Sequence, residues 1–423
     1  MAAVVLLLIV VFLIGVMRGQ VALIMVVSLL LATTLGLKLW SRRATAGLTY
    51  RRSFDPPRIF PGEETTYIVE VQNKKLLPLP WVRIDEHIPA AVVPVVNPSQ
   101  EPSPWNEDKP RKAVIPKARL IWGEEGWQRR RSVSLGRNER LVLRQRFTCA
   151  RRGDYVFGPT DLETGDPFGM FPTHLRAPQT HSLLVYPRIA VIPPIDVLSR
   201  FPFGSTAARP PALEDPARFA GIRDYQPGDP RRWVDWKASA RRLKLQTRVY
   251  APTTQPTLII ALNVQTMPFT WQGFDAERLE AGIGITAACI RDALATRQAV
   301  GLAVNSSGAG MEDFQIFLRP NRRPSQLEDA LALLAKLSPL PTMAFGSFVH
   351  RIASYVPYGA SLLAITAYLD QEAVDDLALL AHRGHAVTLV FLGDELPLDV
   401  GSDIRTLLLP HVDFEPIGGA ESA

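Results

Sequence analysis

The chain has 423 residues, of which 47% are hydrophobic and 21% are charged. This length fits two or three domains, and this composition excludes a predominantly disordered chain. The two cysteines, Cys149 and Cys289, lie far apart and in no metal-binding spacing. They therefore exclude a disulfide framework and indicate free thiols in a reducing compartment.

The charge is distributed unevenly along the chain, whose formal net charge is +6. Residues 249–423 hold 10 basic and 19 acidic side chains, a net of −9. Residues 1–248 hold 37 basic and 22 acidic side chains, a net of +15. This asymmetry indicates that the first part faces something anionic, which a membrane surface, an acidic protein or nucleic acid would satisfy.

Two apolar runs open the chain. Residues 2–17 carry no charge, RGQ interrupts, and residues 21–37 are apolar again. As helices the runs would span roughly 24–26 Å each, just short of the ~30 Å hydrocarbon core of a bilayer. Both runs are apolar on every face, unlike a core helix, and no basic residue precedes the first, unlike a signal peptide. We therefore predict a transmembrane helical hairpin over residues 1–40.

Basic residues set the expected orientation of this hairpin. The turn between the runs contains Arg18 alone, whereas the flank after the second run contains Lys38, Arg42, Arg43, Arg51 and Arg52. The positive-inside rule then places the rest of the chain in the cytoplasm. The prediction is a multi-pass protein of the cell membrane, with the lipid bilayer as one partner.

The next region alternates apolar and polar residues, which is typical of half-buried strands. Such runs occupy residues 66–73, 81–89, 141–149, 153–164 and 181–187. No helical period interrupts them, so we predict an all-β sandwich over residues 45–190. Residues 97–131 are rich in Pro, Trp and charge and read as a long excursion. The RRR run within it either lines a solvated sheet face or contacts anionic lipid.

A Pro-rich linker is expected over residues 191–220, and the pattern of apolar residues changes after it. Apolar strands are predicted at residues 257–264, 299–306, 361–369 and 386–393, alternating with helices at 275–297, 324–338, 346–356 and 371–383. Apolar strands that alternate with helices indicate a parallel sheet covered on both faces. The prediction for residues 221–423 is a doubly wound α/β domain with a basic, Trp-rich entry motif.

That entry motif reads GIRDYQPGDPRRWVDWKASARR. We predict a helix with Asp229 as its N-cap and Pro230 at its first position. Trp233, Trp236 and Ala240 would then share one face, which we expect to be buried. Arg231 and Asp235, four residues apart, could pair along the same helix.

Three interpretations of the motif remain: a joint between domains, a docking surface for an acidic partner, and a nucleic-acid site. The shared face of the two tryptophans and the membrane tether argue against nucleic acid. The residues predicted to bind a partner or join the domains are Arg223, Asp229, Arg231, Arg232, Asp235, Trp236, Lys237, Arg241 and Arg242.

Four segments resemble the bacterial family called domain of unknown function fifty-eight. They are RSFDPPRIFPGEETTYIVEVQNKKLLPLPWVRI, ARRGDYVFGPTDLETGDPFGMF, LLVYPR and RDYQPGDPRRWVDWKASARRLKLQTRVY. The resemblance implies a membrane hairpin, a β-sandwich and a domain similar to von Willebrand factor A. It also implies a MoxR-type AAA+ ATPase and other membrane proteins as partners. It supplies no established reaction.

The same resemblance implies where a metal would bind. Von Willebrand A domains hold Mg²⁺ with an Asp-x-Ser-x-Ser loop after the first strand, where this chain has Asn263, Gln265 and Met267. A second Asp would follow the strand that ends at Thr366, where this chain has Ala367. Neutral amides and a thioether suit Mg²⁺ poorly, so we predict no metal and no cofactor. Asn263, Gln265, Met267 and Thr366 are instead expected at a partner-facing end of the sheet.

The sequence contains no phosphate-binding loop, nucleophile elbow or zinc-protease motif. The close histidines His382 and His385 lie at a predicted helix end, where cationic groups are favourable, and lack a third ligand. The hypothesis is therefore a non-enzymatic, membrane-anchored adaptor. The alternative is an uncharacterised hydrolase with a cleft between the sandwich and the α/β domain.

Overall fold

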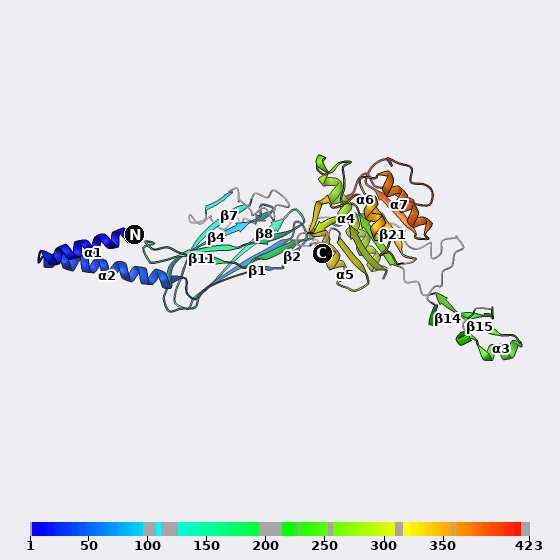
Figure 1. Ribbon diagram of the computed structural model, residues 1–423, viewed down its shortest axis with the longest axis horizontal. Helices are drawn as coiled ribbons and strands as arrows, with labels where there is room; N and C mark the ends of the chain where they lie inside the picture. The colour runs from blue at the N-terminus through cyan, green and yellow to red at the C-terminus, as the bar shows by residue number, and fades with distance from the viewer. Residues whose placement is uncertain are drawn as a thin grey trace, which may run out of the picture. The chain divides into compact units, whose positions relative to one another are not determined.

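The computed structural model of the protein describes residues 2–95, 107–110, 126–193, 214–226, 229, 231–252, 257–308, 316–357 and 359–415. The chain divides into two compact units, residues 1–188 and residues 189–415. Figure 1 shows the apolar helices and the strands of the first unit, and the α/β elements of the second. Each unit is described by itself.

Two helices open the first unit and lie side by side (Figure 1). Helix α1 (Ala2–Met17) and helix α2 (Val21–Ala44) are joined by a short turn in which Gly19 adopts a positive φ of 63°. Gly15 allows α1 to approach Leu23 of α2, because a Cβ there would lie 3.1 Å from that side chain. Only α2, among the described residues, is long and apolar enough to cross a membrane.

The last turn of α2 is fixed to the strands that follow it. Lys75 Nζ donates to the carbonyls of Arg43 (2.6 Å) and Ala44, which caps the helix end. The Ser41 hydroxyl is buried and hydrogen-bonded to Thr173 Oγ1 (2.7 Å). These hydrogen bonds therefore fix the end of α2 to the β-rich part.

Three sheets build that β-rich part. The first has the order β1 (Leu48–Asp55), β3 (Glu64–Asn73), β8 (Arg140–Cys149), β5 (Val92–Pro94). The second has the order β11 (Thr173–Ala177), β10 (Thr160–Thr164), β4 (Leu79–Ile88), β7 (Trp127–Leu135), β6 (Glu107–Pro110). The third has the order β2 (Arg58–Ile59), β12 (His181–Val185), β9 (Gly153–Phe157).

The apolar sides of these strands share one core, which makes the arrangement a sandwich. Every second residue of β3 is buried, as its period-two pattern predicts. Large side chains from the sheets meet there, among them Tyr67, Phe147 and Phe157. The predicted excursion was wrong where it is described, because residues 107–110 form β6 and residues 127–131 belong to β7.

A six-stranded sheet organises the second unit, in the order β19 (Ile316–Asn321), β17 (Ala299–Val304), β16 (Thr257–Leu262), β21 (Ser361–Thr366), β22 (Val387–Phe391), β23 (Arg405–Leu408). Its strands are parallel except β19, which pairs antiparallel with β17. The sheet is therefore mixed rather than purely parallel. The unit also contains two short antiparallel strand pairs. They are β18 (Ser306–Gly308) with β20 (Leu337–Pro341), and β13 (Ala190–Val191) with β24 (Asp413–Phe414).

Helices cover both faces of this sheet, as the alternation of strands and helices predicts. They are α4 (Ala276–Ala295), α5 (Gln326–Ala335), α6 (Phe345–Ile352) and α7 (Gln371–His382). Ile259 and Ala261 of β16 pack in one core with α6 and α7. Gly282 of α4 faces Leu262 and Ile365 from the other side. The coarse prediction of an α/β region after the β-rich one is confirmed.

A further hairpin of the second unit carries the entry motif. Strand β14 (Glu214–Asp224) pairs antiparallel with β15 (Gln246–Pro252), and between them lie the 3₁₀ turn η2 (Arg231–Trp233) and helix α3 (Trp236–Arg242). We call residues 214–252 the basic arm. The predicted linker over residues 191–220 was wrong at its end, because residues 214–220 belong to β14, and residues 194–213 of it lie outside the described residues.

Candidate partner-binding site

The carboxyl ends of β16, β17 and β21 meet at the point where the chain reverses its direction of travel across the sheet. From β16 the chain first adds β17 on one side, and it later adds β21 on the other. Ligands of open α/β sheets bind outside the strand ends at such a switch point. Asn263, Asn305 and Thr366 lie at these strand ends and are buried.

Asn263 joins two of the strands through its side-chain amide. Its Nδ2 donates to Thr366 Oγ1 (2.9 Å) and to the carbonyl of Tyr368 (3.2 Å). Its Oδ1 accepts from Asn305 Nδ2 (2.7 Å) and from the backbone N–H of Gln265 (3.0 Å). Both donors and both lone pairs of the amide are therefore used within the protein.

Asn305 extends the network to the neighbouring loops. Its Oδ1 accepts from the N–H of Val264 (2.8 Å), and its Nδ2 donates to the carbonyl of Met343 (3.3 Å) as well as to Asn263. Its own carbonyl accepts the N–H of Thr342 (2.9 Å). The result is a neutral, satisfied network that ties the strand ends together.

The residues at this position do not fit a divalent cation. Gln265 Nε2 donates to the carbonyls of Met267 (3.0 Å) and Pro268 (3.2 Å), and Ala367 is buried. Asp370 Oδ1 accepts the N–H of Ala373 (2.9 Å), so this carboxylate caps α7. Mg²⁺ needs carboxylate and water oxygens, whereas the side-chain oxygens of Asn263 and Thr366 are neutral and already hydrogen-bonded, and the Asp370 carboxylate is engaged at the start of α7. Among the described residues, no three His, Cys, Asp or Glu side chains gather as metal ligands would.

Next to this network, the loop between β16 and α4 presents two aromatic side chains. Phe269 and Trp271 are 55% and 80% exposed, and their rings stack with centroids 5.6 Å apart. Trp271 lies in the 3₁₀ turn η3 (Thr270–Gln272). This pair was not predicted from the sequence, although the run MPFTWQGF lies between a strand and a helix.

Hydrogen bonds at both ends hold this loop. Gln265 binds the carbonyls at its start, and Thr266 Oγ1 accepts the N–H of Asp275 (2.8 Å) at its end. Asp275 in turn caps α4, because its Oδ1 accepts from the N–H groups of Glu277 (3.0 Å) and Arg278 (3.1 Å). The exposed aromatic pair is therefore displayed on an ordered segment.

The basic arm uses each of its carboxylates between residues 221 and 248 internally. Arg223 binds Asp229 through both Nη atoms (2.7 and 2.8 Å). Asp235 caps α3 through the N–H of Ala238 (2.9 Å) and accepts from Arg248 Nε (2.9 Å). These hydrogen bonds lower the pKa of Asp235, and the guanidinium of Arg223 likewise lowers the pKa of Asp229.

Three predictions for the entry motif were wrong. The helix begins at Trp236 with Asp235 as its N-cap, because Asp229 is engaged by Arg223 and by the N–H of Gln226 (3.0 Å). Asp235 pairs with Arg248 across the hairpin and not with Arg231. The expected buried face is absent from the described arm, since Trp236 is 70% exposed and Ala240 is exposed.

The remaining predicted residues of the arm lie on its surface. Arg231, Arg232, Lys237, Arg241 and Arg242 are exposed. The guanidinium of Arg232 lies over the Trp233 ring, 5.5 Å from its centroid. The arm is therefore a cationic surface on which Asp224, Asp229 and Asp235 are each engaged within the arm.

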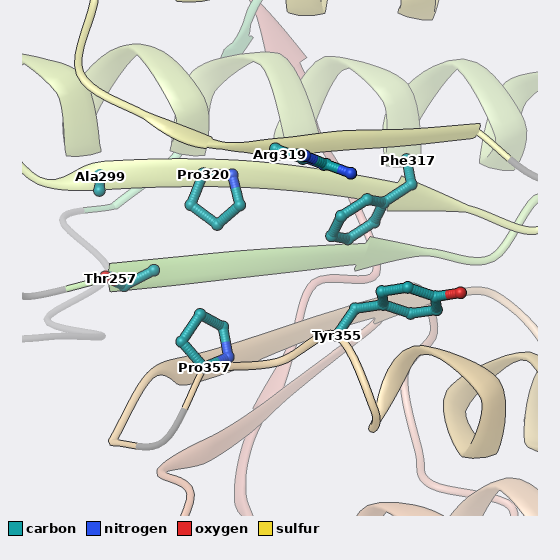
Figure 2. A pocket seen from close by; sticks show the side chains of 7 residues that line it. All are labelled: Thr257, Ala299, Phe317, Arg319, Pro320, Tyr355 and Pro357. Carbon is teal, nitrogen blue, oxygen red and sulfur yellow. The ribbon is translucent and has the colours of Figure 1, made fainter.

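A hollow of about 460 Å³ lies at the other end of the α/β sheet (Figure 2). It is lined by Thr257, Ala299, Phe317, Arg319, Pro320, Tyr355 and Pro357. Phe317 and Tyr355 contact each other, with ring centroids 5.5 Å apart. The lining contains no carboxylate, histidine or thiol and offers no acid–base pair. The hollow belongs to the α/β unit alone and does not bear on the predicted cleft between domains.

Comparison with known proteins supports part of the resemblance. The family model described as "Protein of unknown function DUF58" matches residues 221–314, under a quarter of the chain. The matched range contains most of the basic arm, the aromatic loop, Asn263 and Asn305. A Bacillus subtilis (strain 168) protein described as uncharacterized protein YeaD is 22% identical over 261 residues. That alignment covers 60% of this chain and 54% of the relative, so the chain spans about half the length of the curated protein it matches.

Solved structures with similar segments have sandwich-like folds. The CARDB domain of a Pyrococcus furiosus protein is 16% identical and covers 33% of this chain and 91% of that one, with a TM-score of 0.20. A cohesin module of a Clostridium perfringens glycoside hydrolase is 12% identical and covers 33% of this chain and 98% of that one, with a TM-score of 0.22. Similarities this weak carry no functional argument.

Proposed function

We propose that the protein is a non-enzymatic, membrane-anchored adaptor whose α/β unit binds a partner protein at the carboxyl end of its sheet. The observation that carries this proposal is the exposed, stacked pair Phe269–Trp271 on an ordered loop. Aromatic side chains dominate the binding energy of protein interfaces. Their apolar area is also costly to leave in water, which favours a surface that is covered in use.

The neutral network beneath the loop supports a binding role over a catalytic one. Asn263 binds both Asn305 and Thr366, and the three side chains are buried, so none of them presents a reactive group to solvent. The side-chain amide of Gln265 donates to the loop backbone. Such a platform loses little conformational entropy on binding, because the loop is already ordered.

Helix α2 supplies the anchor in this proposal. At 24 residues it is about 36 Å long, enough for a bilayer core of about 30 Å. We propose that α1 packs beside it within the membrane as a hairpin, and that Arg42 and Arg43 in the last turn of α2 mark the cytoplasmic side. The soluble parts would then work at the cytoplasmic face of the cell membrane.

The partner we propose is a MoxR-type AAA+ ATPase, together with other membrane proteins. The basis is the resemblance of the entry motif, in the range that the family model matches. Nucleic acid is not part of the proposal, because residues 249–423, which contain the aromatic loop, carry a net charge of −9.

Affinity capture from detergent-solubilised membranes tests the proposal. The full chain serves as bait, with and without ATP, and captured proteins are identified by mass spectrometry. The double variant Phe269→Ala/Trp271→Ala should recover at least about 30-fold less ATPase, the effect of losing one interface hot spot. Phe168→Ala, at an equally exposed aromatic (77%) of the first unit, should recover as much as wild type. Equal capture by the double variant would contradict the proposal.

A further inference from the structure

The basic arm carries an excess of positive charge that its own acids do not offset. Asp229 and Asp235 are paired with Arg223 and Arg248, and Asp224 Oδ1 accepts from Gln246 Nε2 (2.6 Å). The cations that form no ion pair with a described carboxylate are Arg231, Arg232, Lys237, Arg241, Arg242 and Lys244. All six are exposed, so the arm offers a ready surface to an anionic partner.

Large apolar side chains lie among these cations. Trp236 is 70% exposed and Leu243 is 91% exposed. Trp236 is the first residue of α3 and Leu243 is its C-cap, so the two exposed apolar side chains mark the two ends of this helix. Lys237 and Arg241, four residues apart, share one face of α3, about 100° round the helix from Trp236. Exposed apolar side chains interspersed with exposed cations are typical of helices that lie in a membrane interface.

Leu243 adds a backbone observation of its own. It adopts a left-handed φ of 54°, which is uncommon for a bulky residue. Leu245 beside it is 50% exposed. Strain of this kind persists where the surrounding structure enforces it, and here it projects an apolar side chain outward.

We propose that the basic arm binds anionic lipid headgroups, with Trp236 and Leu243 inserted at the headgroup level. Trp is favoured at this depth, and juxtamembrane Lys and Arg are attracted to anionic lipids. The same chain carries a helix of membrane-spanning length, so the arm meets lipid as a tethered group at high effective concentration. The proposal concerns a different surface from the aromatic loop and stands or falls independently of it.

The geometry favours lipid over the other anionic partners. A protein hot spot needs a central cluster of buried anchors, whereas Trp236 and Leu243 stand apart on a convex helix. Single-stranded nucleic acid needs successive exposed aromatic rings, and α3 offers one. A lipid interface requires no matching cavity and accepts separate apolar side chains.

A dye placed on α3 would report the lipid contact directly. The full chain with Ala240→Cys is labelled with an environment-sensitive fluorophore, since Ala240 is exposed while Cys149 and Cys289 are buried. It is then reconstituted in vesicles of phosphatidylcholine, alone or mixed with phosphatidylglycerol. Emission should shift to the blue in the anionic vesicles only, and high salt should reverse the shift by screening. A shift of equal size in pure phosphatidylcholine would overturn the proposal.

Two adjacent-arginine variants provide a matched comparison. Arg241→Gln/Arg242→Gln should lower the equilibrium constant for lipid docking by roughly 20- to 30-fold, given the typical attraction of each cation to anionic lipid. Arg322→Gln/Arg323→Gln, at an exposed pair after β19, should leave it unchanged. Trp236→Ala should also weaken the shift. If acidic protein or RNA, and not lipid, produced the shift, the proposal would be wrong.

Discussion

Glu86 shows how one residue can organise the sandwich core. It is 2% exposed on β4, and it accepts hydrogen bonds from the phenols of Tyr50 (2.6 Å) and Tyr67 (2.5 Å). Arg52 on β1 is buried nearby, donates to Thr160 Oγ1 (3.0 Å) and lies over the Tyr50 ring. Buried charge is tolerated only with such partners. Arg52 therefore contributes to the core, although its position in the sequence predicts one of the flanking charges of the membrane helix.

Alkaline pH should lower the stability of the sandwich core. Burial, followed by the Glu86 carboxylate, raises the pKa of Tyr50 and of Tyr67 well above the usual value. The neutral phenols therefore contribute stability that is complete below the unfolded pKa of about 10 and is lost as the pH rises beyond it. Thermal unfolding of the detergent-solubilised chain should show a melting temperature that falls steeply above about pH 10.

Tyr67→Phe is the test of this assignment. It removes one hydrogen bond to a carboxylate, so it should cost about 1.5–3 kcal/mol at neutral pH and flatten the alkaline decline. Tyr355→Phe, at a residue 56% exposed, should reproduce the wild-type curve. A Tyr67→Phe curve parallel to that of wild type would refute the role given to these phenols.

The Asn263 network gives a second expectation at the scale of single residues. Because its oxygens are neutral and engaged, we expect no saturable binding of Mg²⁺ or Mn²⁺ at millimolar concentration by calorimetry of the full chain. Asn263→Ala would leave buried polar groups unpaired and should cost about 3 kcal/mol. A one-site isotherm that this variant abolished would show that the strand ends do hold a cation.

Part of this site was predictable from the sequence and part was not. Apolar strands followed by Asn263 and Thr366 place both residues at carboxyl strand ends, whatever the strand order. That they touch depends on β16 lying beside β21, which no local pattern encodes. The role of Asn305 was missed for the same reason, since it follows the strand on the opposite side of β16.

At the scale of elements, helix α3 shows where local signals compete. Asp-Pro before a run of helix formers is a normal helix start, but it is equally a normal turn. Arg223 of strand β14 binds the Asp229 carboxylate, so this aspartate stabilises a turn and does not cap a helix. Asp235 then becomes the cap. Strands with strict alternation met no such competition, and β3 and β8 begin and end within two residues of the prediction.

The exposure of Trp236 changes what its removal should do. Trp236→Ala should alter the free energy of unfolding by no more than about 0.5 kcal/mol, as expected for a surface position. Phe348→Ala in α6 removes a fully buried ring of the same unit and should cost about 3–5 kcal/mol. Chemical denaturation of both variants measures the contrast. A large loss in Trp236→Ala would show that this tryptophan is buried against another part of the protein.

For the whole molecule, hydrophobic pattern and charge carried most of the information. Period-two strands give way along the chain to apolar strands that alternate with helices, and this change separates a β-rich part from an α/β part. The boundary between the two compact units lies at residue 188 of the sequence. Antiparallel β19 was missed, because its own sequence, IFLRPN, has only three apolar residues before an Arg-Pro pair. The entry motif was predicted to be a helix, because the hairpin over 214–252 rests on pairing between distant segments that no local pattern encodes.

The orientation of the chain in the membrane is the prediction that all proposed partnerships share. Arg42 and Arg43 end α2, Lys38 precedes them, and Arg18 alone lies before it, so the positive-inside rule puts everything after α2 in the cytoplasm. A reporter enzyme that works only in the cytoplasm should be active when it is fused after Ala423. Replacing Lys38, Arg42 and Arg43 by Gln while adding two Lys beside Arg18 should reverse or scramble the topology, because the bias in basic charge is then inverted. Protease added outside intact cells should not cleave the wild-type sandwich or α/β unit. Cleavage there would refute both the orientation and an intracellular ATPase as the partner.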